Sequence, residues 1–137
     1  MALILDTGPL YAALDRSDDF HEACRKLIEA SSEVLIIPAP VLVEVDYWIH
    51  KRMDSSIFDL LLEDILSGAF VVEDLIEEDY LRVRTLTETY RDGDVGFVDA
   101  AVLAVVERLD EPKLATLDRR HFSFLRPRHV PALQLLP

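Results

Sequence analysis

The sequence predicts a three-layer α/β domain, in which a central parallel sheet of four to five strands is flanked by helices. Three observations support this fold class. Short apolar runs alternate with longer stretches that have the apolar spacing of helices. Strands that alternate with helices form parallel sheets covered on both faces. The chain has 137 residues and no repeat or linker, so we expect residues 1–137 to form a single domain.

The expected strands are short apolar runs that end in turn residues, a pattern typical of buried strands. They cover residues 2–5, 33–37, 69–72 and 113–117, with a short last candidate at 132–136. The first strand leads into Asp6, Thr7, Gly8 and Pro9. Thr7 can cap the helix that follows and Pro9 fits its first turn.

The expected helices follow from apolar residues that recur every three or four positions. The first ends near Leu14, and the second runs from Phe20 to Ile28 with Asp18 as a candidate N-cap. The later helices cover residues 41–52, 55–66, 77–90 and 97–109, and residues 92–96 form a loop.

Charge and composition limit the class of protein. The net charge of −12 argues by itself against a nucleic-acid binder, but residues 113–129 carry a charge of +4. No apolar run is long enough to cross a bilayer, and no Lys or Arg precedes the first one, as a secretory signal would require. The single cysteine, Cys24, lies on an apolar helix face and cannot form an internal disulfide, which favours a cytoplasmic location.

Four acidic residues lie where unpaired charges are not expected. Asp6 and Asp118 each follow an apolar strand directly, at the edge of a parallel sheet where ligands bind. Glu44 is three residues from Val41, and Asp99 is three residues from Val102, so both face the apolar side of their helices. Glu44 or Asp99 alone is more often a cap or a salt-bridge partner than a ligand, and the position of Asp6 favours neither role over the other, but the set of four is more specific.

These four carboxylates predict a metal site. Like charges about 4 Å apart repel by roughly 4 kcal/mol at an effective dielectric constant near 20, so a bound cation would relieve their repulsion. Ligands that are all oxygen favour Mg²⁺ or Mn²⁺. The four histidines share no spacing, and we expect them to lie outside the acidic set. Asp92 and Asp94 are expected to serve the turn that contains them.

Four segments resemble the PIN domain, and within it the VapC toxins of bacterial toxin–antitoxin pairs. They are LILDTGPLYAALD, PAPVLVEVDYWI, VGFVDAAVLAVVERL and KLATLDRRHF, and their spacing along nearly the whole chain also fits, so the resemblance covers one complete domain. The loop DGDVGFVDA departs from the family pattern, because relatives more often have Leu-Pro or Leu-Ser before the glycine. Asp94 is therefore an additional acid near the expected site.

The resemblance implies an endoribonuclease that depends on Mg²⁺ or Mn²⁺, in which Asp6, Glu44, Asp99 and Asp118 match the acidic quartet of the family. Thr7 and Thr116 match polar residues near the first and fourth acids, and both are candidate substrate contacts. The resemblance also implies a homodimer that a VapB-like antitoxin holds inactive. Arg119 and Arg120 are candidate RNA contacts because they belong to the basic segment.

Three other functions are alternatives to the nuclease. A phosphoaspartate receiver needs an Asp at the end of the third strand, where this chain has Val71, Val72 and Glu73. A haloacid-dehalogenase-like phosphatase needs an Asp-x-Asp pair, and Gly8 occupies the second position here. A non-catalytic module that binds metal, RNA or a partner stays open as the alternative.

Overall fold

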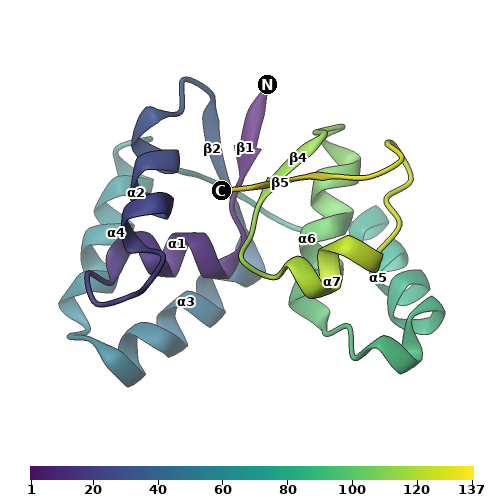
Figure 1. The fold of residues 1–137 in the computed structure, drawn as a ribbon, viewed down its shortest axis with the longest axis horizontal. Helices are drawn as coiled ribbons and strands as arrows, with labels where there is room; N and C mark the ends of the chain where they lie inside the picture. The colour runs from purple at the N-terminus through teal and green to yellow at the C-terminus, as the bar shows by residue number, and fades with distance from the viewer.

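The computed structural model describes residues 1–137 and contains five strands and seven α-helices. In chain order they are β1 (Ala2–Ile4), α1 (Thr7–Leu14), α2 (His21–Ala30), β2 (Val34–Pro38), α3 (Ala39–Arg52), α4 (Ser56–Leu66), β3 (Val71–Glu73), α5 (Glu77–Thr89), the 3-10 helix η1 (Arg91–Gly93), α6 (Phe97–Arg108), β4 (Lys113–Ala115), α7 (Arg119–Phe124) and β5 (Gln134–Leu136). Figure 1 shows the strands in the middle, α1 to α4 on one side and α5 to α7 on the other. The predicted three-layer α/β fold is confirmed.

The strands pair in parallel, but in two hydrogen-bonded groups rather than in one sheet of four to five strands. One sheet has the order β1-β2-β3 and the other contains β4 and β5. A single bridge between Leu5 and Ala115 joins them. The backbone N–H of Leu5 donates to the carbonyl of Ile36 of β2, and the N–H of Asp6 donates to the carbonyl of Ala115 of β4, each at 2.9 Å. β1 therefore lies between β2 and β4.

The side on which successive strands are added changes at β1. From β1 the chain adds β2 and β3 on one side, then crosses to add β4 and β5 on the other. In open parallel sheets, the crevice at the carboxyl ends of strands that flank such a point is the usual ligand site. The residues that follow β1 and β4, Asp6 and Asp118, therefore enter the same crevice.

Two helix starts differ from the expectation. The side chain of Thr7 makes no cap hydrogen bond, and Asp6 occupies the N-cap position of α1. Asp18 accepts a hydrogen bond from the backbone of Phe20 at 2.8 Å and so closes a turn before α2, whose N-cap is Phe20 itself. Phe20 is 53% exposed, whereas Cys24 is fully buried in the core as expected.

Helix α7 is absent from the predicted elements. It has only six residues, which is too short to show a helical repeat of apolar positions. Its N-cap is Asp118, whose Oδ1 accepts a hydrogen bond from the backbone N–H of His121 at 3.1 Å. Phe122 is buried, and Phe124 packs against Tyr90, so these aromatic residues belong to the core of the protein.

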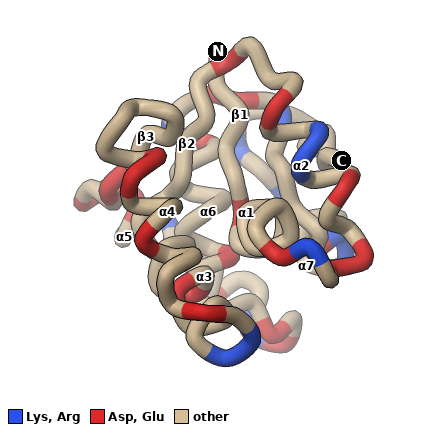
Figure 2. Tube along the Cα trace, turned by 90° about the vertical axis from the view of Figure 1, so that its left-hand side faces the viewer, with Lys and Arg blue, Asp and Glu red and all other residues tan.

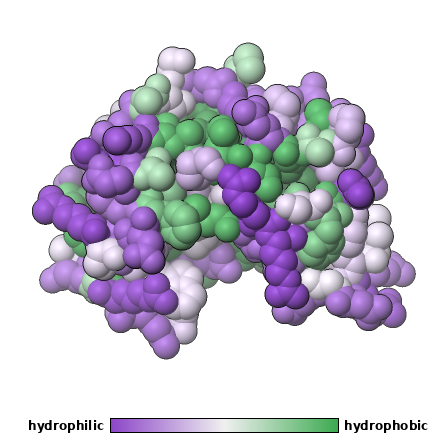
Figure 3. All heavy atoms as spheres, in the orientation of Figure 1, coloured by the Kyte–Doolittle hydropathy of each residue, from purple (hydrophilic) through white to green (hydrophobic).

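The core is a single cluster of 24 buried residues that includes the inner sides of the strands and most of α6. Residues 100–106 of α6 are all buried, because the helix packs against α5, α3 and β2. Figure 3 shows apolar side chains across the middle of one face, between hydrophilic flanks. No helix has the length and apolar character needed to span a membrane.

Buried ion pairs hold α5 and α6 together. The guanidinium of Arg108 on α6 donates to Asp79 of α5 and to Glu73 of β3, and the Asp79 side chain is only 2% exposed. Arg82 of α5 makes a two-pronged pair with Glu107 of α6, at 2.7 and 2.9 Å. These contacts fix the position of α6, the helix that carries Asp99.

Candidate active site

Asp6 lies between the end of β1 and the start of α1 and is 5% exposed. Thr116 donates its hydroxyl hydrogen to Oδ2 of Asp6 at 2.8 Å. The pKa of Asp6 is raised to about 6, mainly by burial and also by the nearby charges of Glu44 and Asp118, although hydrogen bonds from Thr116 and from the backbone of Thr7 oppose the shift. A carboxylate in this position has unusually little water to stabilise its charge.

Thr116 is fully buried and connects two of the acids. Its hydroxyl donates to Asp6 and accepts a hydrogen bond from the backbone N–H of Asp118 at 3.0 Å. The strand end of β4 is thereby tied to the strand end of β1. In this geometry Thr116 orients carboxylates, and a direct contact with substrate stays a prediction.

Glu44 enters the crevice from the opposite side, on α3. Oε1 of Glu44 accepts a hydrogen bond from the hydroxyl of Thr7 at 2.6 Å. The short distance agrees with a charge-assisted bond. Asp46, two residues further along α3, instead lies beside the exposed His50. The predicted separation of these two acids by helix face is correct, and Thr7 positions Glu44 rather than capping α1.

Asp99 projects from the first turn of α6, with a side chain that is 21% exposed. The pKa of Asp99 is raised to about 7, mainly by burial. The charges of Asp6, Asp118 and Glu44 contribute to this shift, and His121 opposes it. Because all three of the other predicted acids act on Asp99, the fold does bring the four acids Asp6, Glu44, Asp99 and Asp118 together.

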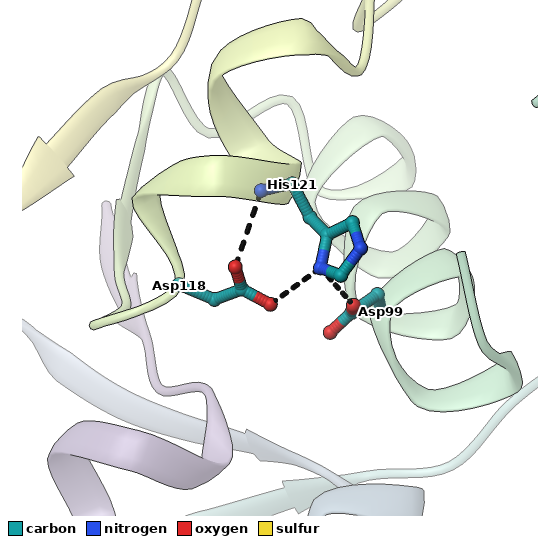
Figure 4. Close-up of side chains that lie close together, drawn as sticks. All are labelled: Asp99, Asp118 and His121. Carbon is teal, nitrogen blue, oxygen red and sulfur yellow. Dashed lines mark hydrogen bonds and ion pairs between the residues drawn. The ribbon is translucent and has the colours of Figure 1, made fainter. Parts of the chain in front are cut away.

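His121 also belongs to this cluster, so the expectation that every histidine lies outside it is wrong. Nδ1 of His121 lies 2.8 Å from Oδ2 of Asp118 and 3.2 Å from Oδ2 of Asp99. Figure 4 shows the imidazole pointing between the two carboxylates. A hydrogen bond with Asp118, followed by the charges of Asp118 and Asp99, raises the pKa of His121, although burial opposes the shift.

The sequence contains a spacing that places His121 beside Asp118, but this spacing is informative only if the unpredicted helix α7 is recognised. Asp118 and His121 are three residues apart, a spacing that places side chains on one face only if the segment is helical. The other histidines are elsewhere: His21 contacts the carbonyl of Ala12, His129 that of Glu111, and His50 that of Asp46.

The donor set of the crevice fits a divalent cation. One atom each from Asp99, Asp118 and His121 lie within 4.8 Å of one another. Burial and mutual repulsion raise the pKa values of Asp6 and Asp99, and the opposing effect of His121 on Asp99 does not cancel the shift. A cation would supply compensating positive charge, since carboxylate and imidazole groups are common ligands of divalent metals.

The two candidate RNA contacts, Arg119 and Arg120, lie at the start of α7 and are exposed. Figure 2 shows a basic stretch beside the label of α7, whereas acidic residues are spread over many segments of the chain. Arg119 donates to the carbonyl of the last residue, Pro137, at 2.5 Å. Arg120 has no side-chain partner, so it is the freer of the two.

An apolar pocket of about 570 Å³ adjoins the crevice at Glu44. Its other walls include Val43 of α3, Tyr80 of α5 and Phe97 of α6, which are 73%, 53% and 48% exposed.

Asp92 and Asp94 lie in the segment that the sequence predicts as a loop, residues 92–96. Asp94 has the left-handed φ of 56°, and both side chains are exposed, which agrees with the expected turn role.

Comparison with known proteins agrees with this geometry. The family model for the PIN domain matches residues 3–126. Ribonuclease VapC26 of Mycobacterium tuberculosis is 30% identical over 125 residues, which are 91% of this chain and 93% of the relative. The chain therefore belongs to the PIN-domain family, and the identity with VapC26 places it with the VapC-type proteins of that family.

Solved structures show the same fold. VapC20 of Mycobacterium tuberculosis, described as a toxin that cleaves the sarcin–ricin loop, has a TM-score of 0.80 at 18% identity, over 94% of this chain and 98% of that one. VapBC2 of Rickettsia felis, bound to a DNA fragment from its promoter, has a TM-score of 0.72 at 17% identity, over the full length of both chains.

Proposed function

We propose that the chain is a metal-dependent endoribonuclease that acts as the toxin of a type II toxin–antitoxin system. The observation that carries the proposal is the convergence of Asp6, Glu44, Asp99 and Asp118 in one crevice of a PIN domain. A sequence identity of 30% with a ribonuclease, over 91% of this chain, supports a catalytic function over a non-catalytic module. The one core cluster supports a single domain over residues 1–137.

The resident cation is proposed to be Mg²⁺ or Mn²⁺. Asp6 and Asp99 are the proposed ligands, and Asp118 and Glu44 either bind the ion or hold its water molecules. When bound, the ion supplies a water of lowered pKa and offsets charge on the phosphate. Thr116 holds Asp6 and Thr7 holds Glu44 in the orientations that these roles require.

The proposed substrate is RNA, which Arg119 and Arg120 contact through phosphates beside the acidic crevice. The proposed partners are a VapB-like antitoxin and a second copy of the chain. The fold shared with VapBC2 of Rickettsia felis supports the antitoxin, and the exposed Leu60, Leu62 and Leu66 of α4 support the second copy. A cytoplasmic location agrees with the one free cysteine.

The test is cleavage of end-labelled total RNA by the partner-free protein, with Mg²⁺, Mn²⁺ or EDTA. We expect discrete fragments that require the metal and that disappear in Asp6→Asn and Glu44→Gln. Asp46→Asn is the matched control, because this acid lies on the other face of α3 beside His50 and should leave cleavage unchanged. Full activity of a folded Asp6→Asn variant would overturn the proposal.

A further inference from the structure

The position of His121 has a chemical consequence for the metal site. The imidazole is held in place by the fold, since its side chain is 16% exposed and its ring packs edge-on against Phe124. Nε2 is buried, which leaves Nδ1 as the nitrogen that faces Asp99 and Asp118. One ring nitrogen is therefore directed at the same two carboxylates that would bind a cation.

Nδ1 of His121 has the spacing of a neighbouring ligand to each of the two carboxylates, and all three donor atoms lie within 4.8 Å of one another. In octahedral coordination, metal–ligand distances of about 2.1 Å place adjacent ligand atoms about 3.0 Å apart. Nδ1 lies 2.8 Å from Asp118 and 3.2 Å from Asp99, on either side of that value. A cation could therefore contact all three groups after small side-chain movements.

The start of α7 orients two of these ligands together. Oδ1 of Asp118 caps the helix by accepting from the backbone N–H of His121, which leaves Oδ2 directed at the crevice. Asp118 and His121 are thus fixed relative to each other by the same short helix. Asp99 approaches from α6, which the ion pairs of Arg82 and Arg108 hold against α5.

We propose that Nδ1 of His121 is a ligand of the divalent cation together with Asp99 and Asp118, and that this nitrogen makes the site prefer a transition ion to Mg²⁺. The proposal rests on the metal site proposed above. Mg²⁺ is bound almost entirely by oxygen, whereas imidazole is a good ligand for divalent transition metals. The site is then a mixed nitrogen and oxygen centre rather than the carboxylate-only centre that the sequence suggests.

Pulsed electron paramagnetic resonance of bound Mn²⁺ tests the proposal directly. The wild-type protein, loaded with Mn²⁺ alone, should show ¹⁴N modulation from a coordinated imidazole. His121→Gln should lose this signal, whereas His50→Gln, which changes an exposed histidine of α3, should keep it. The wild-type spectrum is decisive even if a variant fails to fold, because bound Mn²⁺ without ¹⁴N modulation would overturn the proposal.

Calorimetric titration with Mn²⁺ and with Mg²⁺ gives a second test. His121→Gln should weaken Mn²⁺ binding by about tenfold or more and change Mg²⁺ binding much less. Equal losses for both ions, no loss, or tighter binding would also overturn the proposal.

Asp99→Asn separates the proposed role of His121 from the metal site of the proposed function. If it abolishes Mn²⁺ binding while the wild type shows no ¹⁴N modulation, only the role of His121 is wrong. If Asp99→Asn binds Mn²⁺ as the wild type does, the metal site of the proposed function is wrong as well.

Discussion

At the scale of single residues, the dominant feature is carboxylates held where their charge is costly. Asp6 is 5% exposed, and the pKa of Asp6 is raised from 3.8 to about 6. The folded protein therefore binds a proton at Asp6 more tightly than the unfolded chain does. In the absence of metal, the contribution of Asp6 lowers the free energy of unfolding as the pH rises from about 4 to about 6.

This linkage predicts that Asp6→Asn stabilises the metal-free protein while removing activity. At pH 8 in EDTA the substitution should raise the free energy of unfolding by about 1–3 kcal/mol, because a neutral amide replaces a buried charge. At pH 4, where Asp6 is protonated in the folded protein, the gain should be much smaller. Urea denaturation at both pH values measures the difference, with Asp46→Asn as the control. A less stable Asp6→Asn variant at pH 8 would contradict the proposed origin of the shift.

At the scale of elements, short helices and buried ion pairs decide how the site is assembled. The sequence predicts α6 correctly because its buried run, residues 100–106, is long and strongly apolar. It does not predict α7, which depends on a cap from Asp118 and on packing of Phe122 into the core. Without α7, the relation between Asp118 and His121 is not visible in the sequence.

The ion pairs between α5, α6 and β3 should contribute strongly to stability. Arg108→Met leaves Asp79 buried and without its partner, and should lower the free energy of unfolding by about 3–5 kcal/mol. Arg25→Met is the control, because Arg25 and Glu29 form an exposed pair within α2 that is expected to contribute less than about 1 kcal/mol. Denaturant unfolding of both variants provides the comparison. Equal losses would show that the buried network does not hold α5 against α6.

At the scale of the whole molecule, we expect the charge distribution to control how the proposed RNA substrate reaches the site. The net charge is −12, so an RNA backbone meets overall repulsion and depends on local positive charge. The basic start of α7 lies next to the acid cluster, because Asp118 is the cap of the same helix. This proximity supports a route for the RNA across α7 to the crevice.

Arg120→Gln should therefore weaken RNA binding without affecting the fold. Removal of one phosphate contact should reduce the slope of log affinity against log salt concentration by about one. Arg120 is a better choice than Arg119, which binds the carbonyl of Pro137. Lys26→Gln on α2 is the control for the loss of one exposed positive charge. An unchanged salt dependence in Arg120→Gln would place the RNA on another surface.

The sequence by itself determined the alternation of strands and helices and the inward direction of Glu44 and Asp99. These features are local, since the spacing of apolar residues fixes which side chains share a helix face. Only the tertiary structure decided the partners of Thr7 and Thr116, the inclusion of His121, and the division of the strands into two sheets. Thr116 and Asp6 are 110 residues apart in the chain, and their contact exists because β1 and β4 pack side by side. Such contacts depend on the packing of distant segments, which no local pattern specifies.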